Sequence, residues 1–81
     1  MNVIEKKIRK EANRFKVDVD DLGNLVVARL REHFDDPIGG LIHRDMIKND
    51  TEPLHEAADK VVEFVKEENE REAKKRENKT S

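Results

Sequence analysis

The sequence contains no cysteine, no tryptophan and no tyrosine among its 81 residues, and it has only two prolines and three glycines. Without cysteine the chain has neither a disulfide framework nor a thiolate metal site, which are the usual staples of a small domain. A chain of this length buries only about 60–65% of its unfolded surface. We therefore expect at most one domain, stabilised by helix packing or by association with a partner.

Hydroxyl side chains are also scarce, because the sequence has only Thr51, Thr80 and Ser81. Thr80 and Ser81 lie at the end of the chain, where nothing can hold a nucleophile in position. Histidine and aspartate provide possible metal ligands, but no His-x₃-His pair occurs, and each His-x-Asp pair points to different faces of a helix. These possible ligands are His33, Asp35, Asp36, His43, Asp45 and His55. We expect no enzyme, no catalytic residue, no metal site, no cofactor and no small-molecule substrate.

The sequence also lacks a run of about 18 uncharged apolar residues, the length that a membrane-spanning helix needs. Its first residues, MNVIEKKIRKEANRF, contain no apolar stretch of the kind found in a signal peptide. We therefore expect a cytoplasmic protein that has no membrane partner.

Charged residues make up 44% of the chain and apolar residues 35%, but the two kinds are unevenly distributed. Residues 66–81 (KEENEREAKKRENKTS) contain a single apolar residue, Ala73, and cannot form a core. We predict a helical domain over residues 1–65 and a highly charged extension over residues 66–81, either helical or disordered.

The apolar residues of the first 65 positions recur with helical spacing. Ile4, Ile8, Ala12 and Phe15 follow at steps of four, four and three, which places them on one stripe of a helix. The same reasoning predicts helices over residues 2–16, 19–34, 38–48 and 52–70. The predicted fold is all-α, a small bundle of three to four helices in which the third helix is short.

Capping residues and prolines define where these helices begin. Asn2 and Asp18 can accept hydrogen bonds from the first turns that follow them. Pro37 and Pro53 are tolerated in a first turn and disfavour helical geometry in the residue before them. Gly39 and its neighbouring glycine weaken the first turn of the third helix.

Two of the predicted helices have an apolar surface that is too wide to pack against one core alone. In the second and fourth helices, Leu25, Val27, Val62 and Phe64 cannot all easily reach one core, which makes them the candidate contacts with a partner. We expect a small protein-binding module, such as an adaptor, assembly factor or inhibitor, that acts through an apolar helical face and is oligomeric, with a homodimer as one form. The alternative is a bundle whose second helix is central and wholly enclosed.

A second hypothesis concerns the basic first segment, where Lys7, Lys10 and Arg14 lie on one side of the predicted helix. Concentrated positive charge of this kind can bind the phosphates of nucleic acid. The net charge of -2 and the lack of aromatic residues among the basic ones favour a solvated polar face instead. A helical nucleic-acid-binding regulator stays the alternative function.

Overall fold

The computed structural model describes the backbone of residues 2–80 and the side chains of residues 2–74. Over this range the chain forms four helices and no strand, which confirms the predicted all-α fold. The helices are α1 (Val3–Phe15), α2 (Val19–His33), α3 (Pro37–Asp45) and α4 (Glu52–Thr80). The last side chains of the predicted 66–81 extension lie outside the described residues.

Helices α1 and α2 begin after the residues that the sequence favours as caps. Asn2 Oδ1 accepts the N–H of Ile4 at 2.8 Å, and Asp18 Oδ2 accepts that of Asp21 at 3.1 Å. At the start of α3, Asp36 Oδ1 accepts the N–H of Gly39 at 3.1 Å. These bonds satisfy backbone donors that a helix leaves without an intrahelical partner.

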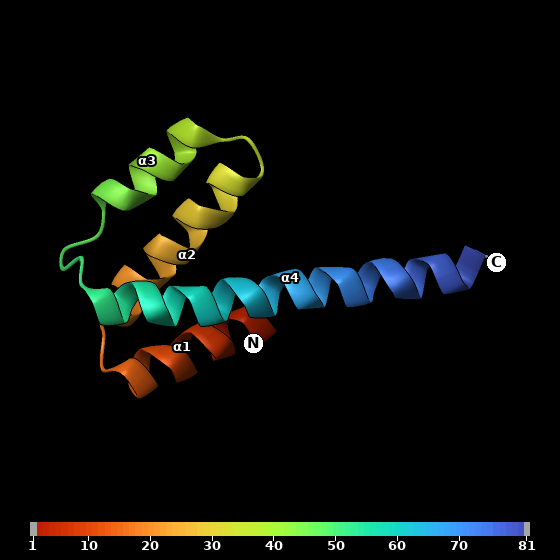
Figure 1. The fold of residues 1–81 in the computed structure, drawn as a ribbon, viewed down its shortest axis with the longest axis horizontal. Helices are drawn as coiled ribbons and strands as arrows, with labels where there is room; N and C mark the ends of the chain where they lie inside the picture. Colours follow the sequence, from red (N-terminus) through yellow and green to blue (C-terminus); the bar gives the residue numbers. More distant parts are fainter. Residues whose placement is uncertain (1, 81) are drawn as a thin grey trace.

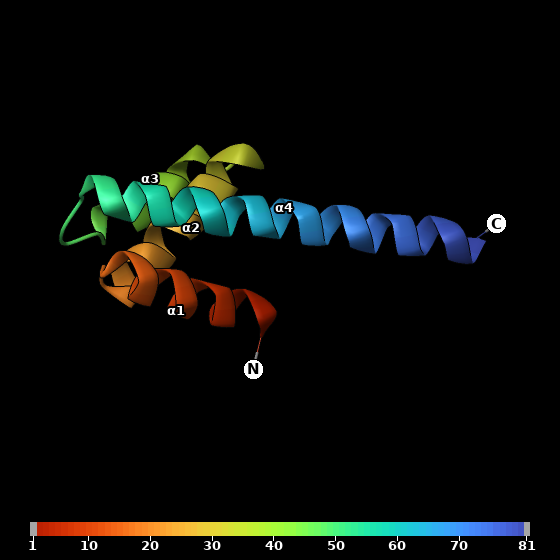
Figure 2. The same cartoon turned by 60° about the horizontal axis from the view of Figure 1, so that its bottom comes forward.

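Helix α2 lies at the centre and packs against each of the other three helices. Helices α1 and α4 lie side by side and run in opposite directions, and both cover one side of α2 (Figures 1 and 2). Among the described helices, α3 packs against α2 alone. The central position of α2 agrees with one of the two arrangements considered from the sequence, but α2 is not wholly enclosed.

The core lies where α1, α2 and α4 meet. It contains aliphatic side chains that are almost fully buried, and Leu22 and Leu25 have no exposed surface. The members of this core cluster are Ala12, Leu22, Leu25, Val26, Leu54, Ala57, Ala58, Val61 and Val65. Side chains of α3 are absent from this set, so α3 is attached outside the main core.

Helix α4 continues without a break across the predicted boundary at residue 65. Its buried side chains end at Val65, and only Glu68 is half-buried among the described residues that follow. The C-terminal half of α4 therefore projects beyond the other helices (Figures 1 and 2). None of the described helices combines the length and the apolar character needed to cross a lipid bilayer.

Candidate protein-binding surface

The buried residues of α3, on the side that faces α2, are two glycines. Gly39 and Gly40 are buried, and a Cβ atom on Gly40 would lie 3.1 Å from the backbone oxygen of Ala28 and 2.7 Å from Cγ of Glu32. Ala28 is itself fully buried. The two helices therefore approach so closely that a side chain at position 40 would require the backbone of α2 and the side chain of Glu32 to shift.

Polar contacts on the same side hold α3 in place. Arg44 donates to both carboxylate oxygens of Glu32, from Nε at 2.7 Å and from Nη2 at 3.2 Å. This hydrogen bonding, helped by the positive charge of Arg44, holds the pKa of Glu32 below its usual range and raises the pKa of Arg44. Beside this pair, Nδ1 of His43 lies 3.3 Å from Oδ1 of Asn24 on α2.

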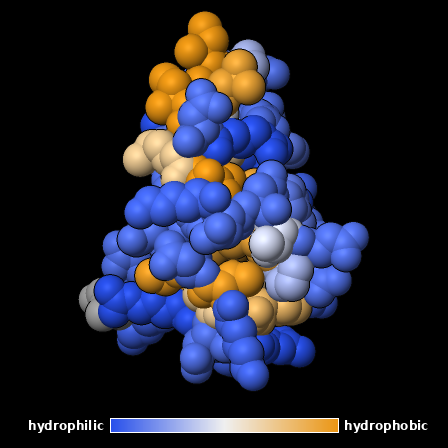
Figure 3. Space-filling view, turned by 90° about the vertical axis from the view of Figure 1, so that its left-hand side faces the viewer, coloured by the Kyte–Doolittle hydropathy of each residue, from blue (hydrophilic) through white to orange (hydrophobic). Residues whose placement is uncertain are grey.

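The large apolar side chains of α3 point the other way, into solvent. Ile38 is 72% exposed, Leu41 60% and Ile42 58%, and together they cover about 100° of the helix circumference. Phe34 and Met46 extend this surface at the two ends of α3 and are also more than half exposed. We call these five residues the α3 outer face. Figure 3 shows hydrophobic side chains gathered at the top of the molecule, over α3.

The amphipathic pattern of α3 is thus the reverse of that of an ordinary surface helix. Such a helix buries its large apolar residues and exposes its charged ones. Here the glycines and an ion-paired arginine face the protein, whereas isoleucine and leucine face water. The result is a contiguous exposed apolar patch, a feature that is uncommon on monomeric proteins.

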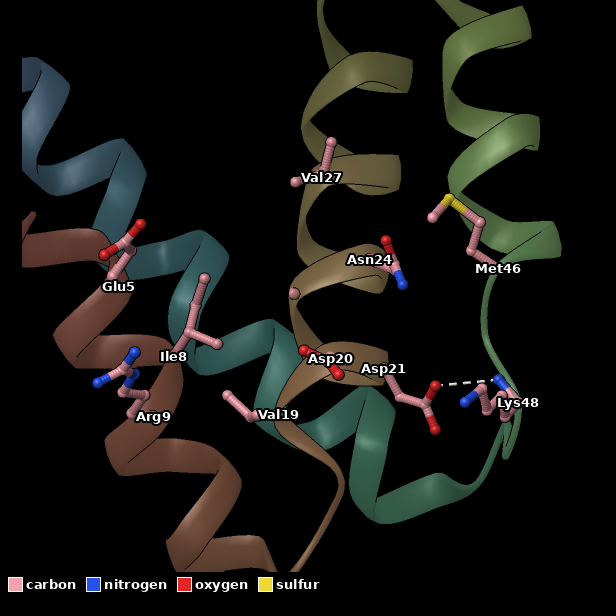
Figure 4. A pocket seen from close by; sticks show the side chains of 11 residues that line it. Glu5, Ile8, Arg9, Val19, Asp20, Asp21, Asn24, Val27, Met46 and Lys48 are labelled. Atoms are coloured by element: carbon pink, nitrogen blue, oxygen red, sulfur yellow. Dashed lines mark hydrogen bonds between the residues drawn. The ribbon is translucent and has the colours of Figure 1, made fainter.

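A groove lies beside this face, over the part of α2 that runs between α1 and α3. Its volume is about 730 Å³, and it is open to solvent. Figure 4 shows Ile8 from α1, Val19 and Val27 from α2, and Met46 from the end of α3 along it. The lining is completed by Glu5, Arg9, Asp20, Asp21, Gly23, Asn24 and Lys48. We call this feature the α2 groove.

The structure places the four contact residues predicted from the sequence at different sites. Leu25 belongs to the buried core beside Leu54, so it has no surface to offer a partner, and its assignment as a contact residue needs correction. Val27 lines the α2 groove. Val62 is half-buried against the core, and Phe64 is half-buried on α4. The four residues do not form one common face.

Sequence reasoning did not single out the α3 outer face. The stripe of Ile38, Leu41 and Ile42 has the spacing of a core face, and spacing alone does not tell which side of a helix is buried. The available signal was the pair Gly39 and Gly40 on the other side of the helix, since adjacent glycines permit two backbones to approach closely.

The basic residues of α1 are partly neutralised by a buried glutamate. Lys7 Nζ lies 3.1 Å from Oε1 of Glu11, and Arg14 Nη1 lies 3.8 Å from Oε2 of the same carboxylate. Glu11 is only 1% exposed. Lys10 is exposed. Two of the three basic residues proposed to bind phosphate thus lie against a carboxylate of their own helix.

Within the part of the chain that the structure describes, no three His, Asp or Glu side chains are arranged to hold a metal ion. Compared with protein-family models, curated proteins and solved structures, the chain shows no significant match.

Proposed function

We propose that the protein is a non-enzymatic, cytoplasmic protein-binding module whose docking surface is the α3 outer face. Adaptor, assembly factor and inhibitor are the roles that such a module can serve. The observation that carries the proposal is the reversed amphipathicity of α3, which exposes Ile38, Leu41 and Ile42 while glycine occupies its buried side. Water is an unfavourable environment for such a surface, and a partner that covered it would gain from the burial.

Helix α3 is held rigidly enough to present this surface. Helix α3 is held on α2 by the close approach at Gly40 and by the two hydrogen bonds that Arg44 donates to Glu32. A docking surface that is already ordered loses little conformational entropy when it binds. The geometry therefore suits recognition by a helix or an apolar groove of another protein chain.

The nucleic-acid alternative has weaker support. Lys7 and Arg14 lie near the buried carboxylate of Glu11, which reduces the positive charge they present to phosphate. A mobility-shift titration decides this question, because phosphate binding weakens steeply between about 50 and 200 mM salt, whereas an apolar interface responds little.

Photo-crosslinking tests the proposed function. A photoreactive amino acid is placed at Leu41 in one variant and at Val3 in the control, since Val3 is similarly exposed (57%) but lies on α1. We expect irradiation of the producing cells to give protein adducts from position 41 and not from position 3. The crosslinked protein is then purified, and its affinity is measured for the wild-type chain and for Leu41→Glu.

We expect Leu41→Glu to weaken this affinity by at least about tenfold, because it places a charge in the centre of an apolar contact. Adducts formed only with nucleic acid, equal adducts from both positions, or an affinity unchanged by Leu41→Glu would each refute the proposed function.

A further inference from the structure

We infer that the partner of the α3 outer face is a second copy of this chain, and that each copy lays its α3 in the α2 groove of the other. This inference rests on the proposed function and names its partner. The resulting dimer is symmetric, because each chain contributes one face and one groove. The two α2 helices and the two α3 helices would together form a four-helix core at the interface.

Gly23 gives the first indication that the α2 groove receives a helix. It is the fifth of the fifteen residues of α2 and lines the groove, and a Cβ atom placed on it would meet no atom within 4 Å. Packing within the chain therefore gives no reason for a glycine, although glycine in a helix is less stable than alanine. A second backbone that passes close to α2 at this point supplies a reason, as α3 itself does at Gly40 on the other side.

The dimensions of the face and the groove agree. Val19 and Val27 flank Gly23 at a separation of about 12 Å along the axis of α2, at 1.5 Å per residue. Ile38 and Met46 are separated by about the same distance along α3. One α3 therefore spans the apolar floor of one groove.

The face and the groove also adjoin each other within one chain. Met46 belongs to both surfaces, because it is exposed at the end of α3 and lines the groove (Figure 4). A twofold axis that passes near Met46 can therefore bring each face against the opposite groove. This contiguity favours a closed pair of chains over an open chain of subunits.

Charges of both signs surround the two surfaces. Asp45 is exposed on α3, and the groove is lined by Glu5, Asp20 and Asp21 as well as by Arg9 and Lys48. In the dimer we place Asp45 of one copy beside Lys48 of the other. The net charge of -2 causes little repulsion between copies.

The apolar area is sufficient for a dimer. The α3 outer face exposes more than half of five large apolar side chains, on the order of 500 Å². Two such faces bury on the order of 1,000 Å², which is the minimum expected of a specific interface before the groove residues are added. A small domain without disulfide or metal also commonly uses association for stability.

Sedimentation equilibrium of the pure full-length protein tests the inference directly. We expect the wild-type chain to be a dimer that dissociates on dilution. Leu41→Glu is expected to be monomeric with an unchanged circular dichroism spectrum, because Leu41 is exposed and its replacement leaves the core intact. The matched control, Val3→Glu, is expected to remain a dimer. A wild-type chain that is monomeric up to about 1 mM overturns the inference.

Gly23→Ala tests the groove separately from the face. In the monomeric Leu41→Glu background, we expect this change to raise the melting temperature by about 2–8 °C, since alanine favours the helix and meets no neighbour. In the otherwise wild-type chain, we expect it to weaken dimerisation by at least about tenfold, because the added methyl group obstructs the incoming α3. An unchanged dimer affinity for Gly23→Ala shows that the groove is not the receptor and overturns the reciprocal arrangement.

These outcomes are distinguishable from a failure of the proposed function. A monomeric pure chain whose Leu41 crosslinks to a different protein overturns the second copy as partner and leaves the protein-binding function standing. A dimer that persists in Leu41→Glu overturns the inferred interface alone, because crosslinking from position 41 still decides whether the α3 outer face docks another protein.

Discussion

The carboxylate of Asp21 accepts a hydrogen bond from the backbone N–H of Lys48, with 2.9 Å between Oδ1 and the nitrogen (Figure 4). Its second oxygen accepts the N–H of Asn49 at 3.2 Å, and Asp21 is only 3% exposed. One buried side chain at the start of α2 thus fixes the segment that leads from α3 to α4. This bond also sets the position of the chain at the end of the α2 groove.

Replacement of Asp21 by alanine is expected to lower the free energy of unfolding by about 1.5–3 kcal/mol, because the backbone N–H groups of Lys48 and Asn49 lose a charged, buried acceptor. Urea denaturation followed by circular dichroism measures this loss. The control is Lys48→Ala, which keeps the backbone N–H and is expected to change stability by less than about 0.5 kcal/mol. Equal losses in the two variants would contradict the role given to the carboxylate.

Gly40→Ala is expected to destabilise the protein by about 1–3 kcal/mol, since its Cβ atom would lie 3.1 Å from the backbone oxygen of Ala28. The backbone of α2 cannot move aside as a flexible side chain can. The comparison is Gly23→Ala in the Leu41→Glu background, which is expected to stabilise the fold by about 0.5–1 kcal/mol. Thermal unfolding of both variants measures the difference, and a neutral Gly40→Ala would show that α3 is not held by close packing.

The helices themselves could be predicted from the sequence, whereas the packing of α3 at Gly40 could not. Periodicity, capping residues and prolines predicted the starts of the four helices to within one residue, because these signals act over a few neighbouring residues. The predicted ends were less accurate: the third helix ends at residue 45 instead of 48, and the fourth at residue 80 instead of 70. Periodicity also predicted that α2 is apolar on more than one side, and Val27 does line an open groove.

The side of α3 that is buried could not be predicted in the same way. It depends on the approach of Gly40 to Ala28, residues that are close in space only after the chain turns between α2 and α3. Likewise, Leu25 and Val27 are both apolar residues of α2, and only the packing of the other helices around α2 decides that the first is enclosed. Burial of this kind is a property of the packed helices and is not encoded in a single helical stripe.

Stability is expected to depend on Glu32 in acid. Its pKa is lowered in the folded protein by the hydrogen bond from Arg44, so the pair stabilises the fold above the ordinary pKa of a glutamate. This contribution is lost as the pH falls below the ordinary pKa of a glutamate and through the lowered pKa of Glu32. Arg44 stays charged throughout this range.

The measurement is the melting temperature at several pH values for the wild-type chain and for Glu32→Gln, because other carboxylates also titrate in acid. We expect the wild type to be the more stable at neutral pH and the difference to shrink as the pH is lowered. A difference that is constant with pH would mean that the bond to Arg44 does not contribute through the charge of Glu32.

Two phenylalanines allow two candidate interfaces to be compared. Phe64 on α4 was predicted from the sequence as a contact residue, and Phe34 belongs to the α3 outer face seen in the structure. Phe64 is half-buried on α4, and Lys7 Nζ of α1 lies 5.6 Å from the centre of its ring. Phe34 is 66% exposed at one end of the α3 outer face. We therefore expect Phe64→Ala to cost about 1–2 kcal/mol of stability through lost burial and cation–π attraction, without weakening dimerisation.

Phe34→Ala is expected to show the opposite pattern, with stability of the Leu41→Glu monomer changed by less than about 0.5 kcal/mol and dimerisation of the otherwise wild-type chain weakened. Urea denaturation and sedimentation equilibrium of the variants provide the two measurements. If Phe64→Ala abolished dimerisation while the monomer kept its stability, α4 would be the docking element, as the apolar arc of the fourth predicted helix suggests. If dimerisation is lost in Phe34→Ala and kept in Phe64→Ala, the interface is the α3 outer face. Phe34 then contributes to association, and Phe64 contributes to folding.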